Sequence, residues 1–364
     1  GRSTLRLEMS QGVPFRVFTL DAPARLVLDF RGLNWEGVTP QDILGETTGF
    51  DGVRFGTFQP GWSRLVADMT RPMLPDQVEM AVDAQTGRAV LRLELASVDE
   101  ADFAAAAGAP QDGLWPDSQQ VAQSAPPVSD DRFVVVIDPG HGGIDPGAER
   151  EGLAEKILRL DVALALRDIL EGVDDVDVVL TRESDVFVSL QSRVALAHRV
   201  GADLFVSLHA DALSQGGARG ATIYTLSQEA SDTASAHLAA SHNRADILAG
   251  ADLSGSDDEV TRVLLDLARR ETEPRSHSLA QAFAQSMAAA GGPMNSRPLR
   301  EAGFSVLKSA DIPSVLIEIG FLSSKRDLEN LRDPLWRQGM TEAMALAILN
   351  WRELDLTQRS LARQ

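Results

Sequence analysis

The first hundred residues contain short stretches in which hydrophobic and polar side chains alternate. These stretches are residues 3–9, 25–30, 53–58, 63–69 and 89–95, and turn-forming Gly, Pro and Asp residues lie between them. Alternation with a period of two gives each strand one hydrophobic and one hydrated side. The pattern therefore predicts a small antiparallel β-sandwich over residues 1–102, with one face of each sheet in water.

The next segment, residues 103–130, offers little that a core could bury. It contains the alanine run 104–107 and the stretch Gln119–Pro127, which is rich in Gln, Ala, Ser and Pro. This composition is typical of a linker between domains.

From residue 131 onward the hydrophobic runs become continuous and alternate with helical patterns. Phe133–Ile137 is apolar at five successive positions, which is typical of a strand buried on both faces. Further strands are expected at 176–180, 204–208, 221–226 and 314–319, and helices at 158–170 and 334–351. This order predicts an α/β domain over residues 131–356, with a mostly parallel sheet flanked by helices.

Composition excludes several classes of function. The net charge of −19 disfavours binding to nucleic acid, where Lys and Arg must neutralise phosphates, and it would repel anionic lipid head groups. There is no cysteine, so thiolate ligands, cysteine nucleophiles and disulfides are all absent. No apolar run is long enough to span a membrane. The chain opens on Gly1 without a signal-peptide core, and we expect it to be a mature form whose export signal lies outside it.

Candidate catalytic residues follow the predicted strands of the second domain. His141 follows the first strand within Asp-Pro-Gly-His-Gly-Gly, His209 closes the strand 204–208, and Glu318 lies at the end of another. Glu155 stands at the start of the helical pattern that continues to Leu170. In open α/β sheets, functional groups gather at the carboxyl ends of the strands. We therefore expect these four side chains to meet.

Two histidines and one glutamate form a recurrent catalytic zinc set that leaves a position open for water. A further carboxylate near that water can act as a general base. The residues thus predict a metal site made of three ligands and a base. Among the other histidines, His198 is expected to pack within a helix, and His237 and His277 are expected to be solvated helix positions.

Several strings in residues 132–355 carry a family resemblance. They are Ile-Asp-Pro-Gly-His-Gly-Gly, Ser-Leu-His-Ala-Asp, Ala-Gly-Phe-Ser-Val-Leu-Lys and Asp-Ile-Pro-Ser-Val-Leu-Ile-Glu, in that order. In these the chain resembles the zinc-dependent N-acetylmuramoyl-L-alanine amidases of bacterial cell division. The resemblance implies that His141, Glu155 and His209 bind one zinc ion and that Glu318 is the catalytic carboxylate. It also implies a periplasmic enzyme that cleaves the amide between N-acetylmuramic acid and L-alanine in peptidoglycan.

The N-terminal sandwich resembles, by position and strand pattern, the AMIN domain that precedes this catalytic domain in many relatives. That resemblance implies binding to peptidoglycan. The alternative is a generic β-sandwich adaptor.

An insertion at about 228–277 suggests regulation. In activator-dependent relatives, a helix of this insertion carries a glutamate into the site, in the pattern Glu-Asn-x-Ala-Asp. This chain has His242-Asn243-Arg244-Ala245-Asp246, so a histidine stands where the blocking carboxylate is expected. Neutral imidazole is a good zinc ligand. We therefore hypothesise that His242 is the fourth ligand of an autoinhibited state; the alternative is a solvated helix residue.

A second helix is predicted in the same insertion, from Asp257 to Arg270. Its acidic start and basic end suit the helix dipole, and positions 260, 263, 264, 267 and 268 form one apolar stripe. Leu265 lies off that stripe. In relatives this helix docks an activator with a LytM-type fold, so the resemblance implies that Leu265 belongs to the docking surface.

Two other functions are compatible with these residues. One is a zinc peptidase that cuts the stem peptides of peptidoglycan with the same ligands and base. The other is a wall-binding protein without catalytic activity, although retention of His141, Glu155, His209 and Glu318 argues against it.

Overall fold

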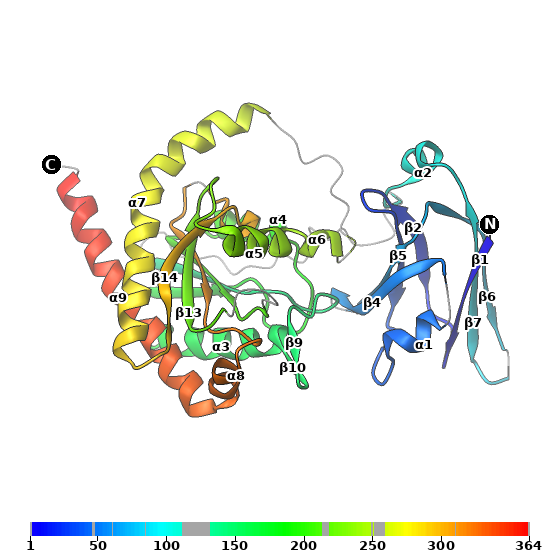
Figure 1. The fold of residues 1–364 in the computed structure, drawn as a ribbon, viewed down its shortest axis with the longest axis horizontal. Coiled ribbons are helices and arrows are strands. Elements are labelled where there is room, and N and C mark those ends of the chain that lie inside the picture. The colour runs from blue at the N-terminus through cyan, green and yellow to red at the C-terminus, as the bar shows by residue number, and fades with distance from the viewer. Residues whose placement is uncertain are drawn as a thin grey trace. The chain divides into compact units, whose positions relative to one another are not determined.

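A computed structural model describes residues 2–45, 48–59, 61–83, 85–110, 132–212, 218–248, 250, 259–309 and 311–362 (Figure 1). For residues 248, 259–271 and 359–362 it describes the backbone alone. The chain forms two compact units, the first built mainly from residues 1–117 and the second mainly from the residues after 118. We call them the sandwich unit and the catalytic unit.

The sandwich unit consists of two antiparallel sheets, as the alternating pattern predicted. One sheet has the order β1-β7-β6 and the other the order β2-β3-β5-β4. The strands are β1 (Arg2–Met9), β2 (Phe15–Leu20), β3 (Arg25–Arg31), β4 (Phe50–Gln59), β5 (Trp62–Met69), β6 (Met73–Val82) and β7 (Ala89–Ser97). Side chains from both sheets, such as Leu7 of β1 and Leu28 of β3, share one hydrophobic core. Strands β2 and β6 were not predicted, because neither shows a clean alternation.

Two short helices complete this unit, α1 (Pro40–Leu44) and α2 (Glu100–Ala106). The side chain of Phe103 in α2 is 1% exposed and belongs to the sandwich core. Ordered structure therefore extends past the expected start of the linker at residue 103. Residues 111–131, which make up most of that segment, lie outside the described residues.

The catalytic unit is built on a six-stranded sheet with the order β11-β8-β12-β15-β13-β14. The strands are β8 (Phe133–Pro139), β11 (Val176–Leu180), β12 (Leu204–His209), β13 (Ala221–Leu226), β14 (Met294–Ala302) and β15 (Ser314–Glu318), with a small hairpin of β9 (Glu149–Arg150) and β10 (Leu153–Ala154) beside it. Four neighbouring strands are parallel, and β13 runs antiparallel to β15. The predicted α/β fold is confirmed; β14 was not predicted.

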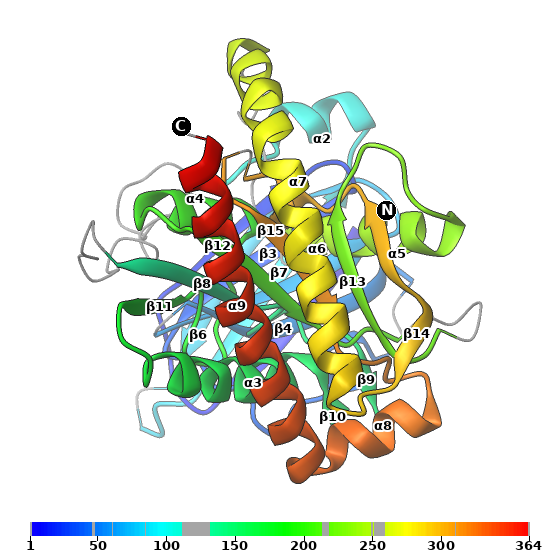
Figure 2. The same ribbon diagram turned by 90° about the vertical axis from the view of Figure 1, so that its left-hand side faces the viewer.

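Helices cover both faces of this sheet. Residues of α3, α7 and α9 contribute to the core on one face, where Figure 2 shows the three helices in front of the strands. Residues of α4 and α5 contribute to the core on the other face. The helices of this unit are α3 (Glu155–Leu170), α4 (Leu190–Arg199), α5 (Thr233–Asn243), α7 (Glu259–Ala289), α8 (Lys325–Arg332) and α9 (Pro334–Ala362), with a short 3-10 turn η2 (Ser305–Leu307). Helix α6 (Ala245–Leu248) belongs mostly to the sandwich unit.

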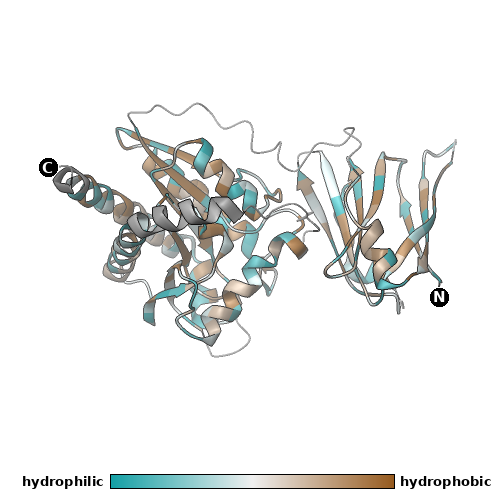
Figure 3. Cartoon of the chain, turned by 90° about the horizontal axis from the view of Figure 1, so that it is seen from above, coloured by the Kyte–Doolittle hydropathy of each residue, from teal (hydrophilic) through white to brown (hydrophobic). Residues whose placement is uncertain are grey.

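Hydropathy explains the difference between the two sheet types. The central strands of the catalytic unit are largely hydrophobic along their length, whereas those of the sandwich unit alternate (Figure 3). All seven residues of β8 are buried, while β1 alternates between buried and accessible positions. A sheet covered by helices on both faces excludes water from nearly every side chain. In the sandwich unit the expected hydrated face is found on β1, whereas β3 and β5 of the other sheet are buried along most of their length.

The described part of the insertion is mostly helical from Thr233 onward, as α5, α6 and the first half of α7. The helix expected at 257–270 does not end at Arg270 but continues as one helix, α7, through Pro274 to Ala289. That expectation was wrong at the boundary, because a proline removes one helical hydrogen bond without always ending the helix. None of the described helices is long and apolar enough to cross a membrane.

Candidate active site

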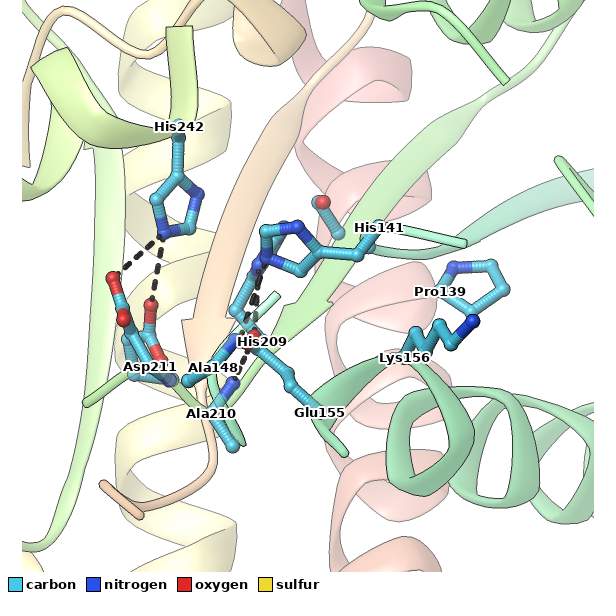
Figure 4. Close-up of polar contacts among 12 residues, drawn as sticks. Pro139, His141, Ala148, Glu155, Lys156, His209, Ala210, Asp211 and His242 are labelled. Atoms are coloured by element: carbon cyan, nitrogen blue, oxygen red, sulfur yellow. Dashed lines mark hydrogen bonds and ion pairs between the residues drawn. The ribbon is translucent and has the colours of Figure 1, made fainter. Parts of the chain in front are cut away.

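The site lies where strands β8, β12 and β15 end. His209 is the last residue of β12 and Glu318 the last of β15, and the two are paired neighbours in the parallel register. His141 lies two residues beyond the end of β8, and Glu155 is the first residue of α3. The structure thus brings together the four residues predicted from sequence. It places His242 of α5, the hypothesised fourth ligand, beside them (Figure 4).

Two glycines make room for the imidazole rings. A Cβ atom on Gly140 would lie 2.2 Å from Cε1 of His209, and one on Gly147 would lie 2.7 Å from the His141 ring and 2.8 Å from the Glu155 carboxylate. Real Cβ atoms do not approach other atoms so closely, so any larger residue would displace a ring. His141 itself has φ of 60°, a left-handed conformation that is uncommon for a residue with a side chain. The surrounding structure must therefore hold this loop in place.

Two buried arginines hold the loop that carries His141. Arg193 donates to the carbonyl oxygens of Pro139 and His141, at 3.1 and 2.9 Å, and forms a buried ion pair with Asp138. Arg182 donates to the carbonyl oxygens of Pro139 and Gly140, at 2.9 and 3.0 Å. Sequence reasoning missed both arginines. Each is more than 40 positions away from the loop, so nothing local in the sequence indicates the contact.

Glu155 occupies the centre of the site and is fully buried. Its Oε1 accepts the Ala210 amide at 2.7 Å and lies 3.3 Å from Nδ1 of His209. Its Oε2 accepts the Ala148 amide at 2.9 Å and lies 3.4 Å from Nε2 of His141. Burial opposes ionisation, but the two histidines outweigh it and hold the pKa of Glu155 well below its usual range. Glu155 is therefore a carboxylate.

Three imidazoles form the tightest cluster of potential metal ligands in the described residues. One ring nitrogen from each of His141, His209 and His242 lies within 4.8 Å of the others. The ring centroids of His209 and His242 are 4.2 Å apart. Burial, and then the neighbouring His242, lower the pKa of His209 to about 3, so its ring is neutral at pH 7. A neutral ring keeps a lone pair for a metal.

Glu318 is the second fully buried carboxylate of the site. Its Oε2 accepts the backbone amide of Asp211 at 2.9 Å, while Oε1 has no hydrogen-bond partner. Burial, followed by the negative charges of Glu155 and Asp211, raises the pKa of Glu318 well above its usual range. Two neighbouring glutamates thus differ in proton affinity, which is the arrangement that separates a ligand or charge stabiliser from a proton carrier.

His242 enters the site from the last turn of α5 and is 6% exposed. Its Nε2 points between two carboxylates, 3.4 Å from Oδ2 of Asp211 and 3.7 Å from Oε1 of Glu318 (Figure 4). No hydrogen bond satisfies this buried nitrogen. The solvated alternative for His242 is thereby excluded. Sequence reasoning missed Asp211 as a partner, although its place directly after His209 and Ala210 is a signal that could have been used.

A buried arginine behind the site was also missed. Arg159 lies one helical turn after Glu155 and is 0% exposed, and none of its three guanidinium nitrogens has a hydrogen-bond partner. Burial lowers its pKa to about 10, against the attraction of Glu155 and Glu318. Arg159 therefore remains a cation near two carboxylates.

The remaining predicted positions lie apart from the site. His237 is exposed, as predicted, and half-exposed His277 contacts Glu301 at 2.7 Å. His198 was expected to be a packing residue of a helix, and this was wrong, because its side chain is 38% exposed and its Nδ1 lies 3.3 Å from Oδ1 of Asp311. The side chain of Leu265 lies outside the described residues.

The donor set fits a metal ion such as zinc. Nδ1 of His209 and Nε2 of His242 are buried without a hydrogen-bond partner, which is costly unless another group binds them. Clustered imidazole nitrogens next to a carboxylate suit zinc by ligand chemistry. The fold and the site together define an α/β domain whose strand ends carry a buried cluster of histidines and carboxylates.

Comparison with known proteins identifies the family. The N-acetylmuramoyl-L-alanine amidase family, Amidase_3, matches residues 135–350, which is the body of the catalytic unit. The chain is 30% identical over 354 residues to N-acetylmuramoyl-L-alanine amidase AmiC of Escherichia coli O6:H1, covering 94% of this chain and 84% of that protein. It is 38% identical over 220 residues to AmiA of Escherichia coli K12, covering 60% of this chain and 75% of that protein.

A similar match extends over nearly the whole chain. AmiC of Neisseria meningitidis serogroup B is 31% identical over 369 residues, covering 98% of this chain and 88% of that protein. The chain belongs to the N-acetylmuramoyl-L-alanine amidase family.

Proposed function

We propose that this protein is a zinc-dependent amidase that hydrolyses the bond between N-acetylmuramic acid and L-alanine in peptidoglycan, for the separation of daughter cells. The observation that carries the proposal is the cluster of two buried glutamates and three imidazoles at the ends of β8, β12 and β15. The membership of the chain in the amidase family supports the bond type.

His141, Glu155 and His209 would hold the zinc ion. Their positions are well supported, because the arginines hold the loop of His141 and two backbone amides hold Glu155. When bound, zinc would polarise the carbonyl of the scissile amide and increase the acidity of water. His209 ends β12, His141 follows β8 and Glu155 begins α3, so little reorganisation would be needed on binding.

Glu318 would move the proton of the reaction. Its Oε2 is held by the Asp211 amide, so the unpaired Oε1 is the oxygen that can take a proton from the attacking water. The hydroxyl oxygen forms a bond to the lactyl carbonyl carbon, the C–N bond breaks, and Oε1 returns the proton to the leaving nitrogen of L-alanine. A carboxyl group with a raised pKa suits both transfers near neutral pH.

The proposal is tested by digesting purified peptidoglycan and reading the products by mass spectrometry. Wild type with zinc should release intact stem peptides that begin with L-alanine, and Glu318→Ala should release none. A zinc peptidase would instead leave L-alanine on the glycan and cut within the stem. Absence of any release, from wild type and from His242→Ala alike, would favour a binding protein without catalytic activity.

We also propose that His242 is a brake. Its ring lies within the same cluster as His141 and His209, and its Nε2 faces Oε1 of Glu318 at 3.7 Å. An imidazole in that place would occupy the position that water needs and would crowd the proton carrier. Movement of α5 away from the strand ends would expose both the position of the water and the Glu318 carboxyl group. Greater release of stem peptides by His242→Ala than by wild type would support the brake, and equal release would contradict it.

Activator dependence is the companion proposal. A partner with a LytM-type fold would dock on the first half of α7, with Leu265 in the contact, and would shift the population of α5 toward the open state. Leu265→Asp should then weaken stimulation by the activator and leave zinc content unchanged. If the activator stimulated Leu265→Asp as strongly as wild type, the proposed docking site would be contradicted.

The sandwich unit would place the enzyme on its substrate as an AMIN-like domain. Similarity to two AmiC proteins that extends over 94% and 98% of the chain supports a shared two-domain organisation. We propose a periplasmic location, where peptidoglycan lies. The isolated residues 1–110 should sediment with peptidoglycan, and a failure to do so would favour the adaptor alternative.

A further inference from the structure

The four-stranded sheet of the sandwich unit is covered on the face that was expected to be hydrated. Val27 of β3 and Val66 of β5 are paired neighbours in the antiparallel register, and both are 0% exposed. Their sequence neighbours Leu26, Leu28 and Leu65 belong to the sandwich core. Successive side chains of a strand point to opposite faces, so the two valines lie on the face turned away from that core. Another part of the chain must therefore cover them.

The covering segment comes from the insertion. Residues 246–256 belong to the same compact unit as the sandwich, although they lie far later in the chain. Gly250 of this segment is buried and has φ of 65°. A Cβ atom on Gly250 would lie 2.9 Å from Cγ2 of Val66 and 3.2 Å from Cγ2 of Val27. A larger residue would be forced away from the two valines, so glycine allows the backbone to approach the sheet this closely.

Two buried arginines of the sheet bind the same segment. Arg64 of β5 donates to the carbonyl oxygen of Gly250 at 2.7 Å, and Arg25 of β3 donates to that of Ile247. Both arginines are 3% exposed, and Arg64 also donates two hydrogen bonds to the Asp29 carboxylate. Hydrogen bonds from charged donors are stronger than those between neutral groups, so these contacts hold the segment in one place. We call Ile247 and Gly250 the latch residues.

An adjacent strand of the same sheet holds the chain that follows His141. Residues 143–145 also belong to the compact unit of the sandwich, and Ile144 is 2% exposed. The Ile144 amide donates to the carbonyl oxygen of Thr57 in β4 at 3.0 Å. One sheet therefore binds both the chain just after His141 and the chain just after His242.

The chain between His242 and the latch residues is short. Five residue steps separate His242 from Ile247, and even when fully extended they span at most about 18 Å. The end of α5 and the start of α6 take up most of these steps, and a helix rises only about 1.5 Å per residue. α5 can therefore move only a short way from the strand ends while the latch residues stay on the sheet.

We propose that the four-stranded sheet latches the brake: the docked latch residues hold α5 where His242 faces Glu318. This inference rests on the proposed brake, and it gives the sandwich unit a regulatory role in addition to the proposed binding of peptidoglycan. Opening of the site then requires the latch residues to leave the sheet as α5 moves. Any change that weakens their docking shifts the population toward the open state.

Substitution of the buried glycine tests the latch. Gly250→Val would place a side chain against Val27 and Val66 and displace the segment. Amide hydrogen exchange in Thr233–Asn243 should become about tenfold faster, the ratio that corresponds to the loss of one charge-assisted hydrogen bond. Gly87→Val is the matched control, because Gly87 has φ of 72° and an added Cβ would meet no atom of the described residues within 4 Å. Unchanged exchange in Gly250→Val, or an equal increase in both variants, overturns the proposal.

A disulfide tests the same contact in the opposite direction. The chain has no cysteine, so Val66→Cys combined with Gly250→Cys introduces its only two thiols. Their Cβ atoms would lie within about 4.5 Å of each other, which suits a disulfide. Oxidation should form the bond, slow amide exchange in α5 and reduce the release of stem peptides several-fold, and a reductant should reverse these effects. Val66→Cys alone cannot form the bond within one chain and should show none of them.

The two measurements separate the latch from the proposed function. Amide exchange needs neither zinc nor turnover, so it tests the latch even in a chain that releases no stem peptide, a result that would contradict the amidase alone. Equal exchange in α5 in the oxidised and reduced states, with the disulfide formed, overturns the latch. Failure of the disulfide to form in the folded double variant also overturns it.

Discussion

Asp138 and Glu318 are buried carboxylates on the two strands that flank β12, yet their surroundings differ. Asp138 is held by Arg193 and accepts hydrogen bonds of 2.6 Å from Thr181 and Ser207. Burial opposes its ionisation, but these partners prevail and lower its pKa. Glu318 has one backbone partner and a second oxygen without any, and its pKa is raised.

This difference shows how the same edge of a sheet can carry one carboxylate suited to a structural role and one suited to proton transfer. A fully paired carboxylate is fixed in charge and position, so Asp138 can support the loop of His141 through Arg193. An unpaired oxygen can exchange a proton, so Glu318 suits catalysis at a cost in stability. Predicted effects should therefore separate, with activity depending on Glu318 and stability depending on Asp138.

The largest expected effect is on catalysis. Glu318→Gln should reduce release of stem peptides by about 10²–10⁴-fold, because an amide cannot carry the proton. Its thermal unfolding temperature should be no lower than that of wild type, since the amide oxygen can still accept the Asp211 amide hydrogen and position 318 no longer carries a buried carboxylate. Mass spectrometry of digests measures the release of stem peptides, and calorimetry measures the thermal unfolding. A variant that keeps more than a tenth of the wild-type rate would contradict the role of Glu318.

The second expected effect is on stability. Asp138→Asn should lower the free energy of unfolding by about 3–5 kcal/mol, because it leaves the Arg193 guanidinium buried without its counter-charge. Since the pKa of Asp138 is lower in the folded state, its contribution is present above the unfolded pKa and is lost as pH falls through the folded value. Urea unfolding at pH 7 and below checks both points; Glu318→Gln is the matched control. A decrease of less than about 1 kcal/mol in the free energy of unfolding would contradict the structural role given to Asp138.

A smaller effect is expected on metal binding. His242→Ala should weaken zinc binding about tenfold, as removal of a neighbouring group commonly does, while it increases peptidoglycan hydrolysis. Competition with a chelating dye measures the affinity. His237→Ala on the same helix removes an exposed imidazole and should change neither quantity. Equal affinities in the two variants would exclude His242 from the metal site.

The smallest effect concerns the pH dependence of stability. Burial alone would lower the pKa of His277, but hydrogen bonds and charge from Glu301 and Glu273 raise it. The stability that His277 contributes is therefore full below its pKa in the unfolded state. That stability is lost as pH rises through its pKa in the folded state. His277→Gln should flatten the stability profile above pH 6.5 by a few tenths of a kcal/mol at most, since exposed pairs are screened. An unchanged profile in careful thermal scans would show that the pair contributes nothing.

Local patterns in the sequence determined much of this protein. Alternating strands predicted the sandwich, continuous apolar runs predicted the parallel sheet, and His141, Glu155, His209 and Glu318 could be selected because strand ends of an α/β sheet converge. These inferences succeed because they depend on side-chain periodicity and on sheet geometry, both of which are local or general. The elements that escaped, β2, β6 and β14, lack a clean period.

Only the tertiary structure decided how the site is supported and which groups His242 contacts there. Arg182 and Arg193 contact the loop of His141 from more than 40 residues away, and His242 reaches Glu318 from a helix 76 positions earlier in the chain. Arg159 reads in sequence as an ordinary charged helix residue, yet it is fully buried. Such contacts depend on how helices pack on the sheet. That packing brings together residues of any separation, so the short-range pattern carries no record of it.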